Sequence, residues 1–227
     1  MDLDITTTAT VRPEILGQTL DSFRTNLLKG NHNYRLIINI DPIGEQNKTQ
    51  EDVLKVARSF FSNIVYNVPE ECSFTKAVIW CWKQSKTDYV FHLEDDWIML
   101  TNVNIDHIFS TINKYPQYSS FALSQYVLNK SHEPPPSLIT NRQRICLNPT
   151  FIRYNFIEQV INLMNCNADP ERQLGRRGKI SRKLKTKHAI YTECGYSPIV
   201  HDIGREWRNN QGYRKTKSGS EAWQRKE

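Results

Sequence analysis

Segments with the pattern of a strand and segments with the pattern of a helix alternate four times in the first 100 residues. The clearest strand is YRLIINID at residues 34 to 41, a nearly continuous apolar run that ends in Asp41. A strand that is apolar on both faces is typical of the centre of a parallel sheet, because helices cover both sides. The alternation predicts an α/β domain with a mainly parallel central sheet and helices on both faces.

The remaining elements are predicted from the same kinds of signal. The helices of the first half are expected after Pro13, at residues 49 to 61 and after the capping residue Ser73. The strands of that half are expected at residues 5 to 11, 34 to 41, 63 to 68 and 89 to 94. Further along the chain we expect a helix at 104 to 114, a strand at 119 to 128, a loop at 132 to 137, a strand at 144 to 152 and a helix at 153 to 165. At 227 residues and 38% apolar content, the chain is expected to form one globular unit.

Positive charge is concentrated near the C-terminus. Residues 169 to 227 contain 15 Lys and Arg against 7 Asp and Glu, whereas the first 168 residues contain 15 against 17. Such a surplus fits either a polyanionic partner, such as nucleic acid or ligand phosphates, or a solvated surface that keeps the protein soluble.

The sequence also bears on the compartment. No stretch has the pattern of a signal peptide, and no run of about 18 apolar residues predicts a membrane span. The five cysteines are odd in number and scattered, which favours reduced thiols. We expect a protein of the cytoplasm, or of the host cytoplasm if the chain is viral.

Three consecutive carboxylates, Glu94, Asp95 and Asp96, end the strand YVFHLE and are followed by the apolar run WIML. Ligands bind open α/β sheets at the carboxyl ends of the strands. Adjacent carboxylates need either a compensating cation or solvent, and their oxygens suit Mn²⁺ or Mg²⁺. The triplet is therefore either a metal site or a solvated turn, and its apolar flanks favour the metal site.

These features resemble the GT-A glycosyltransferases, especially the family-2-like ones. The resemblance rests on a T/V-rich first strand followed by R-P-x-x-L and a helix containing S-F, a second strand ending in Asp, and a fourth strand ending in an E/D-x-D triplet. It implies a single Rossmann-like GT-A domain. Residues 1–100 would bind a nucleotide sugar, most simply a UDP-sugar, residues 101–205 would bind the acceptor, and 206–227 would form a basic tail.

The resemblance also implies roles for single residues. Asp96 would bind a divalent metal that bridges the donor phosphates, and Glu94 would lie near the ribose or a metal-bound water. The other residues expected to contact the donor are Thr7, Thr8, Arg12, Asp41, Lys76 and Asp95. Asp41 could equally begin a turn before Pro42, and Lys76 could equally be an ordinary exposed lysine.

Transfer with inversion needs a general base near the acceptor hydroxyl. Asp169 and Glu171 stand at a predicted helix start, where Glu171 is the preferred base and a capping or surface acid is the alternative. His201, next to Asp202, matches a late metal ligand of many GT-A enzymes, and a structural histidine is the alternative. His92 and one of Trp80 and Trp82 are expected in the core.

Two acceptor classes remain open. The basic segment and the small size resemble the phage enzymes that glycosylate hydroxymethylated bases in DNA, and a carbohydrate or lipid-linked acceptor fits equally. A nucleotidyltransferase is disfavoured because TTTATVRPE lacks a Gly-rich loop. A non-catalytic nucleic-acid-binding module is the remaining alternative.

Overall fold

The structure is a computed structural model that describes residues 1–125, 145, 147–175, 178–192, 198–215 and 223–225. The strands are β1 (Asp2–Val11), β2 (Asn33–Gly44), β3 (Ile64–Asn67), β4 (Tyr89–Glu94), β5 (Trp97–Met99), β6 (Tyr118–Leu123), β7 (Thr150–Arg153), β8 (Lys187–Tyr191), β9 (Val200–Asp202), β10 (Tyr213–Lys215) and β11 (Trp223–Arg225). The helices are α1 (Pro13–Asn26), α2 (Gln50–Phe60), α3 (Phe74–Gln84), α4 (Ile105–Lys114), α5 (Tyr154–Ile161), α6 (Pro170–Leu174), α7 (Lys179–Leu184) and α8 (Gly204–Asn210).

A seven-stranded sheet in the order β3-β2-β1-β4-β7-β6-β8 forms the centre of the molecule. Strands β3, β2, β1 and β4 are parallel, β7 is antiparallel to both β4 and β6, and β8 is parallel to β6. The predicted fold class is confirmed. The antiparallel direction of β7 was not predicted, because hydrophobic pattern alone does not fix strand direction.

Local signals place the helices as the sequence suggested. Pro13 stands in the first turn of α1, and the Ser73 hydroxyl accepts a hydrogen bond from the Lys76 amide at the start of α3. At α2, Thr49 and Asp52 form a capping box in which each side chain accepts from the other residue's amide. These caps satisfy amides that the first helical turn leaves without partners.

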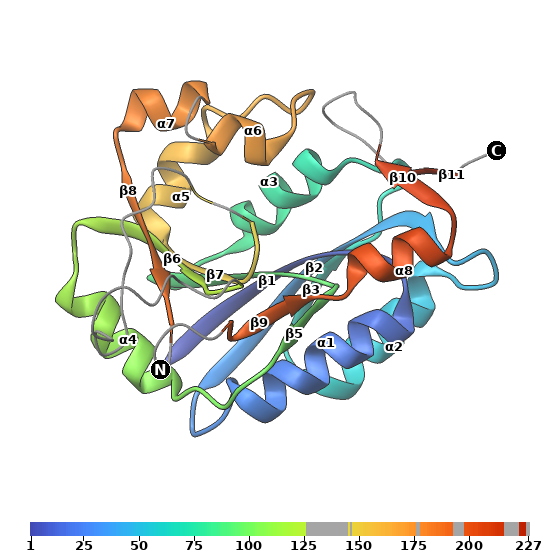
Figure 1. Ribbon diagram of the computed structural model, residues 1–227, viewed down its shortest axis with the longest axis horizontal. Coiled ribbons are helices and arrows are strands. Elements are labelled where there is room, and N and C mark those ends of the chain that lie inside the picture. Colours follow the sequence, from blue (N-terminus) through green and yellow to red (C-terminus); the bar gives the residue numbers. More distant parts are fainter. Residues whose placement is uncertain (126–144, 146, 176–177, 193–197, 216–222, 226–227) are drawn as a thin grey trace.

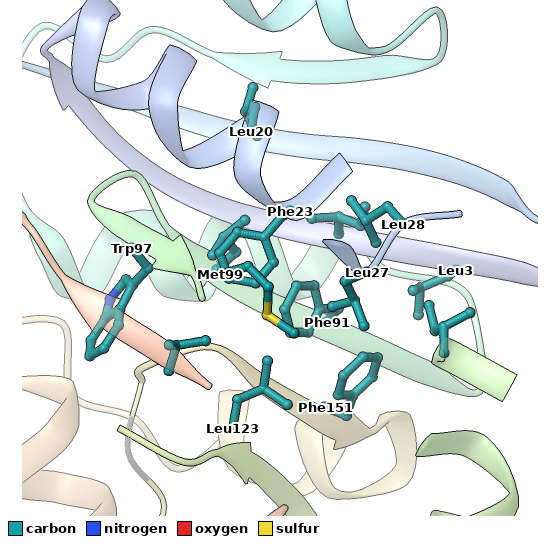
Figure 2. Packing of buried hydrophobic residues seen from close by; sticks show 14 of the residues in the cluster. Leu3, Leu20, Phe23, Leu27, Leu28, Phe91, Trp97, Met99, Leu123 and Phe151 are labelled. Carbon is teal, nitrogen blue, oxygen red and sulfur yellow. The ribbon is translucent and has the colours of Figure 1, made fainter. Parts of the chain in front are cut away.

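Two hydrophobic clusters cover the two faces of the sheet, and the helices lie on both sides of it in Figure 1. The larger cluster joins α1, α2 and α4 to one face, where Figure 2 shows Phe23, Phe91 and Phe151 from three elements in contact. The Phe91 and Phe151 rings stack with centroids 4.5 Å apart. The smaller cluster joins α3, α5, α6 and α7 to the other face and contains the fully buried Trp82.

Several detailed predictions can be compared with these elements. Trp82 and His92 are completely buried, as expected, and Trp80 is half-buried. Cys72, Cys81 and Cys166 carry free thiols, whereas Cys146 and Cys194 lie outside the described residues. The strand expected at 144 to 152 is shorter and later, at β7, and the loop expected at 132 to 137 also falls outside the described residues.

A small antiparallel sheet pairs β5 with β9 and was not predicted. Its register sets Trp97 opposite Asp202 and Ile98 opposite His201. The pairing brings a segment from the C-terminal part of the chain to the residues that directly follow Asp96. It thereby completes the edge of the sheet where the carboxylate triplet lies.

Candidate functional site

The carboxyl ends of β1, β2 and β4 meet at one edge of the sheet and bring together polar residues that are far apart in the sequence. Thr8 of β1 pairs in register with Glu94 of β4, and Thr10 pairs with Asp41 of β2. Asp95 follows β4, and its amide donates to the Thr8 carbonyl at 3.2 Å. This edge is where open α/β sheets bind ligands.

Asp95 is held almost completely by the protein. The Thr10 amide and hydroxyl donate to its Oδ2 at 2.9 and 3.3 Å, and Arg12 Nη2 donates to its Oδ1. The Thr19 hydroxyl of α1 donates to its backbone carbonyl at 2.8 Å. Only 3% of Asp95 is exposed, so its role is to hold β1, Arg12 and α1 together at the site.

Arg12 links the two aspartates of the triplet. Its Nη2 also donates to Asp96 Oδ2 at 3.1 Å, and the guanidinium lies 5.0 Å from the ring centroid of Trp207 in α8. The side chain is 1% exposed. Burial alone lowers the pKa of Arg12, but the adjacent Asp95 and Asp96 charges outweigh burial and raise the pKa overall.

Asp96 is the more accessible aspartate, with 19% of its side chain exposed. The pKa of Asp96 is raised to about 6, because loss of solvent and the charges of Asp95 and Asp202 raise it by more than Arg12 lowers it. The Ile203 amide donates to the Asp96 backbone carbonyl at 2.9 Å, which ties the start of α8 to the site. A positive charge placed beside Asp96 would therefore favour its ionised form.

The residues around Asp96 fit a divalent cation that is shared with a ligand. Within the described part of the chain, no group of three or more His, Cys, Asp or Glu side chains forms a complete protein metal site. Mg²⁺ and similar ions, however, are usually bound by one or two carboxylates together with waters and substrate phosphates. Asp96 and Asp202 could supply those two carboxylates.

The other two acids of this edge have defined partners. Glu94 Oε2 accepts from Trp97 Nε1 at 3.2 Å. Asp41 is 5% exposed and accepts hydrogen bonds from the Cys72 thiol and the Ser73 amide, at 3.2 and 3.0 Å. Burial raises the pKa of Asp41. Asp41 thus connects the end of β2 to the first turn of α3.

The remaining residues expected at the donor lie at different depths. Thr7 is completely buried within β1, and Thr8 is 7% exposed. Lys76 is exposed in the first turn of α3, with its ammonium 4.0 Å from Glu71. Lys76 therefore stands on the solvent side of the helix whose start Asp41 contacts.

Asp169 and Glu171 lie at the start of α6. Asp169 caps this helix by accepting from the Arg172 amide at 2.8 Å, and the exposed Glu171 accepts from the Leu147 amide at 3.4 Å. The Thr75 hydroxyl of α3 donates to the Ala168 carbonyl at 2.7 Å. That bond places the start of α6 beside the first turn of α3.

His201 is exposed on β9, one residue before Asp202. Consecutive side chains of a strand point to opposite faces. Asp202 is one of the charged groups that act on the Asp96 carboxyl, together with Arg12 and Asp95. Asp202 is thus the residue of this segment whose charge acts on Asp96, and the role of His201 as a metal ligand stays a prediction.

Three residues of the site were missed from the sequence: Thr10, Trp207 and Gly204. Thr10 lies in the predicted first strand, and its distance of two residues from Arg12 was the available signal. Gly204 packs so closely on Asp96 that a Cβ there would lie 1.8 Å from Asp96 Oδ2. Nothing in the local sequence indicates that α8 folds back onto Arg12, because that contact depends on the β5–β9 pairing.

No family model and no curated protein matches the sequence. Solved structures do match. S. aureus TarS aligns with a TM-score of 0.57 at 9% identity, over 89% of this chain and 37% of that chain. S. aureus TarS 1–349 in complex with UDP-GlcNAc aligns with a TM-score of 0.54 at 12% identity, over 86% of this chain and 57% of that chain.

A third match is a mannosyltransferase, PcManGT from Pyrobaculum calidifontis, in complex with GDP-Man and Mn²⁺. It aligns with a TM-score of 0.53 at 8% identity, over 74% of this chain and 49% of that chain. The chain therefore shares its fold with these structures, one of which is a mannosyltransferase. The chain spans 37% to 57% of the length of these three structures. Within the ranges that the structure describes, no helix has both the length and the apolar character needed to cross a bilayer.

Proposed function

We propose that this protein is a metal-dependent glycosyltransferase that moves a sugar from a nucleoside-diphosphate sugar to an acceptor hydroxyl. The observation that carries the proposal is Asp96, a partly exposed carboxylate with a raised pKa, at the carboxyl end of a central parallel strand and beside Asp202. The structural matches include proteins in complex with UDP-GlcNAc and with GDP-Man and Mn²⁺, which supports a nucleotide-sugar donor.

The donor would bind along the 1–100 half, at the edge formed by β1, β2 and β4. Asp96 and Asp202 would hold Mn²⁺ or Mg²⁺, which as a Lewis acid stabilises the charge that develops on the leaving diphosphate. Asp41 would face the base or ribose of a UDP-sugar, and Glu94 the ribose. The other donor contacts are assigned to Thr8, Arg12, Lys76 and the backbone around Asp95. Thr7, which is buried within β1, would support this edge from inside the sheet.

The acceptor would bind in the 101–205 half. Glu171 is exposed at the start of α6, beside the first turn of α3, so its carboxylate is available to take the proton from an acceptor hydroxyl. Asp169 is used as the helix cap and would fix the backbone that presents Glu171. The free thiols of Cys72, Cys81 and Cys166 support a reducing compartment such as the cytoplasm.

The proposed donor site is tested by thermal shift with a panel of nucleoside-diphosphate sugars, with and without Mn²⁺. A donor that binds only the folded chain raises the melting temperature, and the rise should require the metal. Asp96→Asn should remove this metal-dependent shift, whereas Lys29→Gln, an exposed position on the opposite edge, should keep it. A wild-type protein that no donor stabilises would contradict the enzyme assignment and favour a non-catalytic module.

For the acceptor, we propose DNA, contacted by a basic surface on α6, α7 and β8. This basic surface consists of the exposed side chains of Arg172, Lys179, Arg182, Lys183, Lys185 and Lys187. No ion pair links these cations to another described residue. Arg176 and Arg177 lie outside the described residues. Unpaired surface cations are available to replace the counterions of a polyanion.

Binding to duplex DNA over a range of salt concentrations tests the basic surface. Replacing Lys179, Arg182, Lys183 and Lys185 with Gln should flatten the slope of log affinity against log salt by about 3 to 4 units if all four contact phosphates. A control with equal charge loss replaces the exposed lysines at 29, 48, 55 and 114 and should keep the slope. Absence of DNA retention at low salt would favour a carbohydrate or lipid-linked acceptor.

A further inference from the structure

Arg12 is a buried cation whose contacts come from the middle and from the C-terminal part of the chain. Its guanidinium lies between Asp95 and Asp96, and the Trp207 ring covers it at 5.0 Å. Arginine over an aromatic face is stabilised by the quadrupole of the ring, and more strongly when water is excluded. The position of Arg12 therefore depends on α8 as well as on the carboxylates.

The segment 203–213, here called the C-terminal clamp, is fixed to the site at several points. The Ile203 amide donates to the Asp96 carbonyl at 2.9 Å. The Trp207 ring stacks on Tyr213 with centroids 5.9 Å apart and planes 11° apart. The Tyr213 hydroxyl donates to the Gly44 carbonyl at the end of β2, at 2.7 Å. Trp207 is therefore held in place from both sides, by Arg12 and by Tyr213.

A divalent cation and Arg12 would compete for the same carboxylate. Arg12 Nη2 already donates to Asp96 Oδ2, and two positive centres at one carboxylate repel each other. Asp95 stays with Arg12 in either case, because Thr10 fixes the Asp95 carboxylate. Cation binding at Asp96 would therefore turn the guanidinium about its bond to Asp95.

We propose that Arg12 is the resident counter-ion of Asp96 and that Trp207 is a positioning residue that sets the affinity of this site for divalent cations. When Asp96 binds a cation, Arg12 leaves Asp96 and presents its freed N–H groups to the donor diphosphate. The C-terminal clamp loosens because Trp207 then loses its contact with the Arg12 guanidinium, one of the contacts that hold it. The step toward the diphosphate rests on the proposed function. The competition between Arg12 and the cation does not.

The competition is measured by calorimetric titration of Mn²⁺ into the full chain without any donor. Trp207→Ala removes the ring that holds Arg12 and should tighten Mn²⁺ binding by about threefold to tenfold, the range expected from a cation–π contact. Trp207→Phe keeps an aromatic face and should stay closer to the wild type. Arg24→Gln removes a similar contact, 6.0 Å from the Phe60 ring and far from the triplet, and should change nothing.

Hydrogen–deuterium exchange supplies a second readout. Mn²⁺ alone should increase amide exchange across residues 203 to 213 of the wild type, and this increase should be absent from Asp96→Asn. The proposal is overturned if Trp207→Ala, shown to be folded by circular dichroism, binds Mn²⁺ no more tightly than the wild type. It is equally overturned if Mn²⁺ leaves exchange in the clamp unchanged.

These outcomes separate the inference from the proposed function. If Trp207→Ala binds Mn²⁺ more tightly but no nucleotide sugar stabilises the protein, the donor assignment is wrong and the role of Arg12 stands. If donors bind in the presence of metal but Trp207→Ala binds Mn²⁺ no more tightly than the wild type, the donor assignment stands and the role of Trp207 is wrong.

Discussion

The adjacent aspartates of the triplet have different surroundings. Both carboxylate oxygens of Asp95 accept hydrogen bonds from the protein, and the side chain is 4% exposed. Asp96 shares Arg12 with it but keeps 19% of its side chain exposed and stands near the charge of Asp202. Asp95 is therefore mainly structural, while Asp96 is available to a ligand.

This difference predicts unequal losses of stability from two matched substitutions. Asp95→Asn leaves Arg12 buried with half of its compensating charge and should lower the free energy of unfolding by about 3 kcal/mol. Asp96→Asn should cost less, because it also removes repulsion from Asp95 and Asp202. Urea unfolding of both variants measures the difference. Equal losses of stability would contradict the division of roles between the two aspartates.

The sequence predicted where the carboxylates lie but not what surrounds them. The run YVFHLE ends at the sheet edge because apolar periodicity stops there, and this is a local property. The contacts of Arg12 and Thr10 with Asp95 join residues about 85 positions apart and depend on the register of β1 against β4. Register across a sheet is set by packing of the whole core, which a single segment does not encode.

At the scale of elements, length decided which strands could be predicted. β2 and β4 are continuous apolar runs and were predicted close to their observed bounds. β5 and β9 have three residues each, too few to show a period of two, although they carry Asp202 and α8 to the site. The element that closes the candidate site was thus the one that local pattern could not indicate.

Close packing of α8 on Asp96 predicts that Gly204→Ala will damage the site. The new methyl group would lie 1.8 Å from Asp96 Oδ2, so α8 or the carboxylate must move. Such overpacking typically costs about 1 to 3 kcal/mol, and the metal-dependent donor shift should weaken as well. Thermal unfolding and the donor panel measure the two effects.

Gly17→Ala in α1 is the matched control for this substitution. Its Cβ would meet Val56 Cγ1 at an ordinary 3.6 Å, and alanine favours helix by about 1 kcal/mol over glycine. The control should therefore raise stability and keep donor binding. A Gly204→Ala variant as stable as the wild type, with an unchanged donor shift, would show that α8 does not press on Asp96.

At the scale of the whole molecule, two histidines buried on different strands make the free energy of unfolding depend on pH. His92 of β4 is completely buried and hydrogen-bonds Thr6 Oγ1 through Nδ1 at 3.1 Å. His188 of β8 is 1% exposed, with Nδ1 and Nε2 at 2.8 and 3.0 Å from the hydroxyls of Ser120 and Thr186. Burial lowers the pKa of His92 to about 3 and that of His188 to about 4.

These shifts predict a loss of stability in mild acid. The unfolded chain takes up protons on both histidines below about pH 6.5, while the folded chain does not protonate His188 until about pH 4. Between these values, each buried histidine should therefore remove about 1.4 kcal/mol of unfolding free energy per pH unit as the pH falls. Above pH 7 their contribution is constant.

His188→Gln isolates one of the two contributions. The amide keeps a hydrogen-bonding group beside Thr186 but cannot take up a proton, so the slope between pH 6.5 and 4 should fall by about 1.4 kcal/mol per unit. Urea unfolding at half-unit pH steps measures the slope, and the region from pH 7 to 8 gives the pH-independent cost of the substitution. An unchanged slope in the variant would mean that His188 protonates in the folded chain as readily as in the unfolded one. In that case the packing of β8 against β6 and α5 would be open to water, and the sheet edge beside α7 would be looser than the structure shows.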